Sequence, residues 1–221
     1  MKNRMFFLVL IFLTQTVFAG GFSVGNGGDI IRCPILEKYL SLDYVLTGST
    51  LKDLVKIKTK EESFERIGQF LEKNVPELAL SYRNFAKLIF NKTDFSQYYI
   101  WRPIQFLKDL PDEEFFNIPG VCGLPSHGAA DMHQAIIREF VSTKLFPEGQ
   151  VVFSYEPETI NLLKDDALQI SFLFTHEWIW KIAPNAKVNR QINRFLHSEE
   201  AENLSATEVR ARLKSMGAII L

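Results

Sequence analysis

The stretch Ile170-Ser-Phe-Leu-Phe-Thr-His-Glu-Trp-Ile-Trp-Lys-Ile182 decides the fold of this chain. It closes a longer periodic segment, from Pro157 to Ile182, which begins amphipathic and becomes apolar almost all round. A helix that is apolar on every side belongs in the centre of a hydrophobic core. We therefore expect a helix over 157–182 whose second half is surrounded by the rest of the chain.

Two polar residues, His176 and Glu177, interrupt this apolar run. In the helix of a zinc peptidase a second histidine follows the first by four residues, so that both bind one metal ion. Trp180 occupies that position here, and an indole does not bind zinc, so no metal ligands and no cofactor are predicted. His176 and Glu177 remain candidate catalytic residues for a hydrolase, with or without a metal ion.

A carboxylate buried on an apolar helix has to be protonated or paired, because an isolated buried charge is costly. Candidate partners lie in a predicted helix over 188–198, where four polar residues share one face by their i, i+3, i+4 and i+7 spacing. They are Arg190, Asn193, Arg194 and His197. One interpretation is a structural ion pair of Glu177 with Arg190 or Arg194. The other is a functional polar cluster of His176, Glu177, Arg194 and His197 that lines a cleft.

The beginning of the chain has the pattern of an export signal. Met1-Lys-Asn-Arg4 carries two cations, Met5–Leu13 is apolar, and Val17-Phe-Ala19 has a small residue where a signal peptidase cleaves. The apolar run is too short for a permanent membrane anchor, which needs about 20 residues. We expect a signal peptide at 1–19, no transmembrane anchor after its cleavage, and one globular domain at 20–221 that is periplasmic or secreted.

The composition excludes some classes of partner. The chain of 221 residues has a formal net charge of −1, and removal of Lys2 and Arg4 makes the rest more acidic. Nucleic-acid binding calls for a basic face, so no nucleic-acid partner is expected. About 200 residues are enough to form one well-buried core.

Cys33 and Cys122 are the two cysteines of the chain. In an oxidising compartment an even pair predicts one disulfide, and two buried free thiols are the alternative. Neither cysteine belongs to a CxxC motif, which argues against a metal site.

The remaining patterns predict a mixed fold. The glycine-rich segment 23–29 is predicted as a loop, 29–33 and 150–155 as strands, 39–46 as a strand or a helix, and 98–101 as a strand or buried segment. Helices are predicted over 60–73, 132–145 and 205–216, and over a segment that has Pro76 in its first turn and reaches Ile89. Ser205 and Glu208 have the spacing of a capping box, and Gly217 is a typical helix end. The predicted fold class is α+β: a mainly helical single domain with a small sheet and one disulfide.

Several of these segments, taken in order, resemble a group of small exported bacterial proteins that has no known activity. The similar segments are Gly27–Cys33, Leu42–Tyr44, Pro119–Cys122, Gln134, Ala167–Trp178 and Arg190–Ser198. The resemblance implies one exported domain in which the cysteines and the His-Glu helix belong to a shared framework. It implies no catalytic role for any residue.

We expect an exported binding or envelope-associated module, and the alternative is a hydrolase that uses His176 and Glu177. A partner from the cell envelope, docked on a Phe-rich surface, is a further interpretation. An enzyme should place His176 and Glu177 in a solvent-reachable cleft beside another titratable group. A docking module should expose a contiguous apolar patch.

Overall fold

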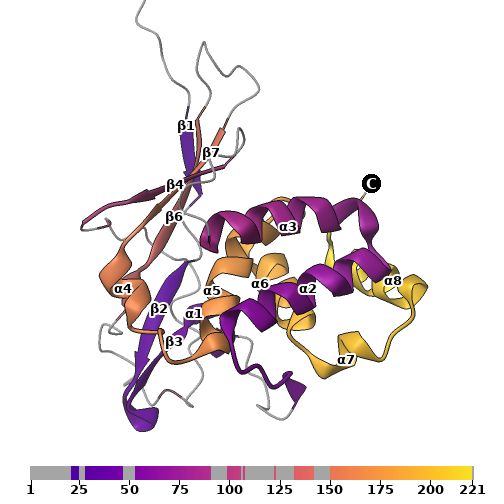
Figure 1. The fold of residues 1–221 in the computed structure, drawn as a ribbon, viewed down its shortest axis with the longest axis horizontal. Helices are drawn as coiled ribbons and strands as arrows, with labels where there is room; N and C mark the ends of the chain where they lie inside the picture. The colour runs from indigo at the N-terminus through magenta and orange to yellow at the C-terminus, as the bar shows by residue number, and fades with distance from the viewer. Residues whose placement is uncertain are drawn as a thin grey trace, which may run out of the picture.

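Helix α5 (Ala167–Ile179) is the central helix of the protein, as its sequence predicts. Every residue from Gln169 to Ile179 is buried, and α1, α2 and α6 pack against it. Figure 1 shows α5 inside the helical body, beside the sheet. The helix begins where the Asp166 carboxylate accepts a hydrogen bond from the backbone N–H of Gln169.

The computed structural model describes residues 21–24, 28–46, 53–90, 99–105, 107, 122, 132–141 and 150–220. Its helices are α1 (Leu42–Leu46), α2 (Lys60–Asn74), α3 (Pro76–Phe90), α4 (Pro157–Asn161), α5, α6 (Ala186–Leu196), α7 (Glu199–Glu202) and α8 (Ala206–Met216), with a 3₁₀ turn at Pro34–Leu36. Its strands are β1 (Gly21–Val24), β2 (Asp29–Cys33), β3 (Lys38–Ser41), β4 (Tyr99–Pro103), β5 (Met132–Gln134), β6 (Ile136–Val141) and β7 (Gln150–Tyr155). The predicted signal peptide at 1–19 lies outside the described residues.

The outer helices form where local signals and apolar spacing agree. In α2, Phe64, Ile67 and Leu71 recur at helical spacing and are buried, which directs one face of the helix into the core. Helix α8 begins at the predicted capping box of Ser205 and Glu208 and ends at Gly217, whose φ of 98° is left-handed. These predicted helices are confirmed.

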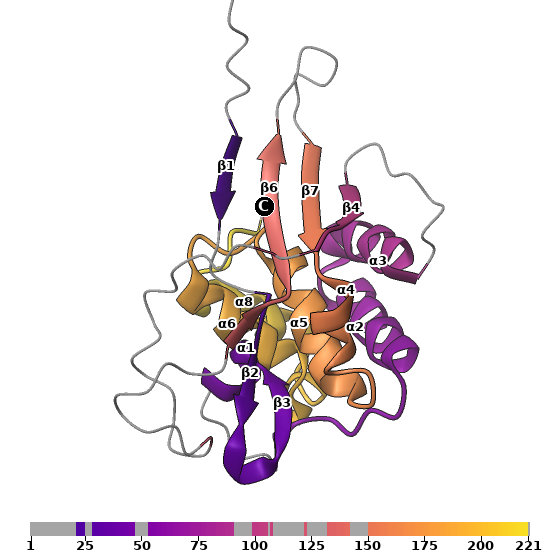
Figure 2. The same cartoon turned by 90° about the vertical axis from the view of Figure 1, so that its left-hand side faces the viewer.

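The strands form two small sheets. One has the order β1-β6-β7-β4, in which only the β4–β7 pair is parallel, and the other has the order β3-β2-β5 and is antiparallel. Figure 2 shows the first sheet above the β2–β3 hairpin, with the helices packed beside both. The larger of two hydrophobic clusters joins the helices to Ile30, Ile136 and Phe153 of the sheets.

The two sheets are connected by a bulge at Gly28. The backbone carbonyl of Gly28 accepts hydrogen bonds from the N–H groups of both Ala135 and Ile136, at 2.7 and 3.1 Å. β1, which precedes Gly28 in the chain, pairs with β6, and β2, which follows Gly28, pairs with β5. Gly28 has a φ of 73°, a conformation that glycine adopts without steric cost. The bulge thus lies where the β1–β6 pairing of the first sheet gives way to the β2–β5 pairing of the second.

The predicted disulfide between Cys33 and Cys122 is present, with a Cα–Cα distance of 4.4 Å. Both cysteines are buried in a second, smaller apolar cluster with Ile31, Leu40 and Leu42. The fold class is confirmed as α+β: a mainly helical single domain with small sheets and one disulfide. None of the helices in the described ranges has the length and apolarity that crossing a bilayer requires.

The helix predicted over 132–145 is wrong. Residues 132–134 and 136–141 are strands β5 and β6, and β6 is hydrogen-bonded to β1 on one side and β7 on the other. This segment has apolar residues at helical spacing, but pairing with two neighbouring strands outweighs the local pattern. The loop predicted over 23–29 is wrong in part for the same reason, because β1 and β2 occupy both of its ends.

The single helix predicted over 157–182 is in fact two helices. α4 ends at Asn161, a turn follows, and α5 starts after Asp166. The Asp166 side chain accepts a hydrogen bond from the start of α5, an N-cap arrangement that begins a new helix rather than continuing an old one. The segment 39–46, left open between strand and helix, contains both: β3 ends at Ser41 and α1 starts at Leu42.

Candidate functional site

A buried polar cluster around Asp43 joins α1, α5 and α6. Asp43 Oδ2 lies 2.6 Å from His176 Nδ1 and accepts a hydrogen bond of 2.7 Å from Asn193 Nδ2. Arg190 Nε lies 3.4 Å from Asp43 Oδ1. All four side chains are buried, so the carboxylate and its partners stabilise one another in a region of low dielectric constant.

The protonation of this cluster follows from its contacts. Burial alone would raise the pKa of Asp43, but the charge and hydrogen bond of His176, with Arg190 and Asn193, hold it below its usual value. Burial would lower the pKa of His176, and the Asp43 carboxylate outweighs this effect and raises it. Trp180 Nε1 donates to His176 Nε2 at 3.0 Å. An indole N–H can only donate, so this bond requires the neutral ring with its proton on Nδ1.

His197 lies in a second buried chain of hydrogen bonds. Its Nδ1–H donates to the Asn193 carbonyl at 2.8 Å, so Nε2 accepts from Ser171 Oγ at 2.7 Å. Ser171 in turn accepts from Ser63 Oγ of α2 at 2.5 Å. The ring stacks on Phe172, and burial lowers the pKa of His197 to about 3. A serine–histidine pair is thus present, but it is sealed in the core.

Glu177 points away from this cluster, toward the bulge that joins the sheets. A Cβ placed on Gly28 would lie 2.8 Å from Glu177 Oε1, so only a glycine leaves space for the carboxyl group. Burial raises the pKa of Glu177 to about 7, although the charges of His176 and Arg138 act in the opposite direction. Within the described part of the chain, no hydrogen bond or ion pair holds its carboxyl group.

The structure brings together some of the predicted site residues and separates others. Arg190, Asn193 and His197 face α5 and are buried, whereas Arg194 is partly exposed and lies 4.0 Å from Asp53. His176 and Glu177 are neighbours on one helix, and successive helical residues face different directions. The predicted ion pair of Glu177 with Arg190 or Arg194 does not form, because Arg190 faces Asp43.

Sequence reasoning missed Asp43, Ser63 and Ser171. Asp43 stands in an apolar run, Leu40-Ser-Leu-Asp-Tyr-Val-Leu46, and the argument applied to Glu177 applies equally to this acid. Serines give no comparable signal, because they occur at the surface, in caps and in cores alike. The buried cluster has no side chain that presents a reactive atom to solvent, since His176 and His197 are both fully buried.

A separate cleft with a volume of about 910 Å³ opens between the sheet and the helices. Residues of α2, α3, α4, α5, β4 and β7 line it, together with the segments that precede α2 and α5. None of the polar residues predicted as a site is among those lining residues. No sequence pattern predicted this cleft, because it is formed by elements that are far apart along the chain.

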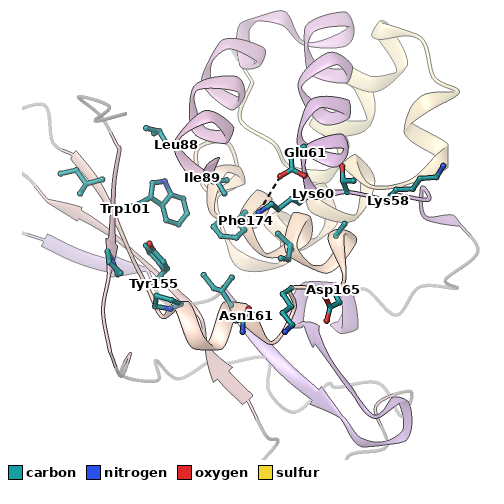
Figure 3. A pocket seen from close by; sticks show the side chains of 18 residues that line it. Lys58, Lys60, Glu61, Leu88, Ile89, Trp101, Tyr155, Asn161, Asp165 and Phe174 are labelled. Carbon is teal, nitrogen blue, oxygen red and sulfur yellow. Dashed lines mark ion pairs between the residues drawn. The ribbon is translucent and has the colours of Figure 1, made fainter. Parts of the chain in front are cut away.

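The two ends of the cleft differ in chemistry. Figure 3 shows Trp101 and Tyr155 at one end, Phe174 in the middle, and Lys58 and Asp165 at the other end. The charged residues along the wall of this second end are Lys58, Lys60, Glu61, Lys164 and Asp165. The cleft therefore offers aromatic and aliphatic surface to one part of a bound molecule and charged side chains to another.

The apolar end is built on rigid aromatic packing. Trp101 stacks on Phe153 with ring centroids 4.4 Å apart and contacts Phe174 at 5.4 Å. Its indole N–H is shielded from solvent and has no hydrogen-bond acceptor among the residues that the structure describes. A buried donor of this kind is satisfied when an oxygen or a water molecule approaches it.

Comparisons with known proteins add no family assignment. No family model matches the chain, and neither a curated protein nor a solved structure matches it.

Proposed function

We propose that this protein is an exported binding module that holds a small molecule with a large apolar part in the cleft between β4, β7, α3 and α5. The volume of the cleft, about 910 Å³, is the observation that carries the proposal. Ligand sites usually have volumes of about 300–1,000 Å³ and are mainly apolar, with a few polar groups that orient the ligand. Trp101, Tyr155 and Phe174 supply the apolar surface.

Export is supported by two independent features. The first 19 residues have the composition of a signal peptide. The Cys33–Cys122 disulfide is typical of a protein that folds in an oxidising compartment. Whether the exported protein stays in a periplasm or enters the medium depends on the cell envelope of the organism. The proposal is therefore export through the general secretion route, without a choice between these two compartments. N-terminal sequencing of exported protein tests it, with a start at Gly20 expected and retention of Met1 contradicting it.

The hydrolase alternative has weaker support. A general base has to lie within hydrogen-bond reach of the proton that it removes from the substrate or from a water molecule. His176 is fully buried, its Nδ1 contacts Asp43, and its Nε2 accepts from Trp180. Glu177 lies against the Gly28 bulge. The Asp43 cluster instead suits a structural role, since it fixes α1 and α6 on the central helix.

A direct binding experiment tests the cleft. N-phenyl-1-naphthylamine is an uncharged apolar dye that fluoresces strongly in an apolar site, and we expect the folded protein to bind it at one site. Two variants narrow the cleft from its wall: Ala167→Trp at the start of α5 and Asn161→Trp at the end of α4. Both should lower the affinity at least tenfold.

The matched control is Ala211→Trp, which adds the same side chain to an exposed position of α8 that does not line the cleft. It should bind the dye as the unmodified protein does. Thermal melts identify any variant that fails to fold, and Asn161 is exposed, so its variant should retain the fold. Absence of dye binding, or equal binding by all the variants, would refute the proposed function.

A further inference from the structure

We infer that the bulge at Gly28 makes the cleft sensitive to pH: it stays closed while the Glu177 carboxyl group is neutral and opens locally when that group ionises. The opening loosens the cleft wall at Tyr155 and Pro157, so the protein holds its ligand less firmly as the pH rises. This inference rests on the proposed function and adds the regulation of the same cleft. The opening itself can be measured without any ligand.

Glu177 is buried against the bulge without a direct partner. Its exposed fraction is 3%, and in the described part of the chain no hydrogen bond or ion pair joins its carboxyl group. A Cβ placed on Gly28 would lie 2.8 Å from Glu177 Oε1, so the carboxyl group packs on the backbone of the bulge. An ionised carboxylate is costly to bury without partners, so this packing suits the neutral acid alone.

The charged groups around Glu177 do not replace a direct partner. His176 on the same helix and Arg138 on β6 favour the ionised form, and Asp43 on α1 opposes it. Burial outweighs the two cations and raises the pKa of Glu177 to about 7. The titratable groups on the two other strands next to the bulge are Asp29 of β2 and His133 of β5.

The bulge is a point at which the sheets can open locally. The N–H groups of Ala135 and Ile136 both bond to the Gly28 carbonyl, so two amides depend on one acceptor. The strand pairing also changes here, from β1–β6 to β2–β5. Local openings need less free energy than global unfolding. An opening that admits water to Glu177 removes the cost of burying its charge, so ionisation favours the open form.

A backbone hydrogen bond links the bulge to the cleft. Ala135, whose N–H bonds to the bulge, accepts the N–H of Glu156 on its own carbonyl at 3.0 Å. Glu156 stands between Tyr155 and Pro157, which both line the cleft. Figure 3 shows Tyr155 in the cleft wall. Release of Ala135 from the bulge therefore loosens the backbone that carries these two lining residues.

Amide hydrogen exchange, followed residue by residue by NMR, tests the opening. A carboxyl group with a pKa of about 7 in the closed form and 4.5 in water should raise the opening constant about 70-fold from pH 5 to pH 8. The exchange rates of the Ala135 and Ile136 amides, divided by that of an unprotected amide at the same pH, should rise by this factor.

Glu177→Gln is the control, because its side chain has a similar shape and does not ionise. In this variant the corrected exchange rates of the two amides should change by less than about threefold over the same pH range. Asp29 and His133 are present in both proteins, so the difference between the proteins reports Glu177. The same pH dependence in the variant and in the unmodified protein would overturn the inference.

Urea distinguishes a local opening from global unfolding, which exposes much more surface. At pH 8 the Ala135 and Ile136 amides should exchange equally fast with and without 1 M urea. The amides of Ile67 and Leu71, which are buried in α2, should exchange faster in urea. An equal urea dependence of both pairs of amides would also overturn the inference.

The dye tests the link between the bulge and the cleft. A ligand that binds the closed form alone stabilises it by mass action, so N-phenyl-1-naphthylamine at ten times its dissociation constant should slow exchange of the Ala135 amide about tenfold at pH 8. Ala167→Trp, whose cleft is narrowed, should show no slowing at the same dye concentration. Unchanged exchange in the dye-bound protein would overturn the link. Absence of dye binding would instead refute the proposed function, while exchange without dye still decides whether the bulge opens with pH.

Discussion

Glu177 shows how a single buried acid ties the stability of this protein to pH. Burial raises its pKa to about 7 from an ordinary value of 4.5. Between these two pH values the folded protein holds a proton that the unfolded chain has lost. The free energy of unfolding should therefore fall as pH rises from about 4.5 to 7 because of this group, by about 3 kcal/mol in total.

Glu177→Gln removes that contribution. From pH 5 to pH 8 the stability of the variant relative to the unmodified protein should rise by about 3 kcal/mol. Urea melts of both proteins at the two pH values measure this difference. Parallel pH profiles would contradict the assignment. An ion pair with Arg190 or Arg194 would have the opposite effect, since its loss would destabilise the variant most where Glu177 is ionised.

Trp180 has a measurable effect on the neighbouring histidine. Its indole N–H donates to His176 Nε2, and this hydrogen bond favours the neutral ring. Trp180→Phe keeps an aromatic ring and removes the donor, so the pKa of His176 should rise further above its ordinary value. A proton–nitrogen NMR titration of the His176 ring measures the change. An unchanged or lower pKa would mean that the indole does not select the neutral ring.

For single residues, the sequence indicated which side chains are buried more reliably than which side chains contact one another. The apolar neighbours of His176 and Glu177 predicted their burial, and Asn193 and His197 were predicted on one face of a helix that is buried as expected. The partner of His176 is Asp43, which lies more than a hundred residues earlier in the chain. Spacing along a sequence carries no signal for a contact of that kind, whereas it does for residues three or four apart.

Among the glycines that the structure describes, Gly28 at the bulge leaves the least space for a side chain. A Cβ at this position would lie 2.5 Å from the Ile136 carbonyl oxygen and 2.8 Å from Glu177 Oε1, and φ is 73°. Gly28→Ala should therefore destabilise the protein by at least about 2 kcal/mol, because strain and steric overlap act together.

Gly68→Ala is the matched control for this prediction. Gly68 lies within α2, and its Cβ would meet Arg83 at 3.5 Å, an ordinary contact. Alanine is the better helix former, so this variant should be unchanged or more stable, by up to about 1 kcal/mol. Denaturant melts of both variants decide the matter. Equal effects of the two substitutions would rule out a special requirement for glycine at the bulge.

The accuracy of the predicted elements followed the range of the interactions that form them. α8 was predicted at both ends, because its capping box and its terminal glycine lie next to the helix. The segment 132–145 was predicted wrongly, because β6 depends on pairing with β1, which is distant in sequence. Local signals fix helix ends, whereas strands depend on neighbours that a single sequence does not reveal.

For the whole molecule, the disulfide should contribute a large share of the stability. It joins residues separated by 89 positions, and the chain-entropy model gives about 4.6 kcal/mol for closing a loop of that length. Cys33→Ala/Cys122→Ala should lower the free energy of unfolding by about that amount, measured by urea melts without reductant. A loss below about 1 kcal/mol would indicate that the unfolded chain is barely constrained by the bond. Two alkylatable thiols in the native protein would show that the bond is absent.

The pairing of β1 with β6 and of β2 with β5 also fixes the order in which the chain can fold. Gly21 pairs with Val141, and Asp29 with Gln134, so the first strands have no partners until most of the chain has been synthesised. Contacts of this range form slowly, whereas the neighbouring helices α2 and α3 meet early. The N-terminal strands should therefore be ordered late in folding, and the signal peptide that we propose for residues 1–19 would still be accessible to an export machinery at that point.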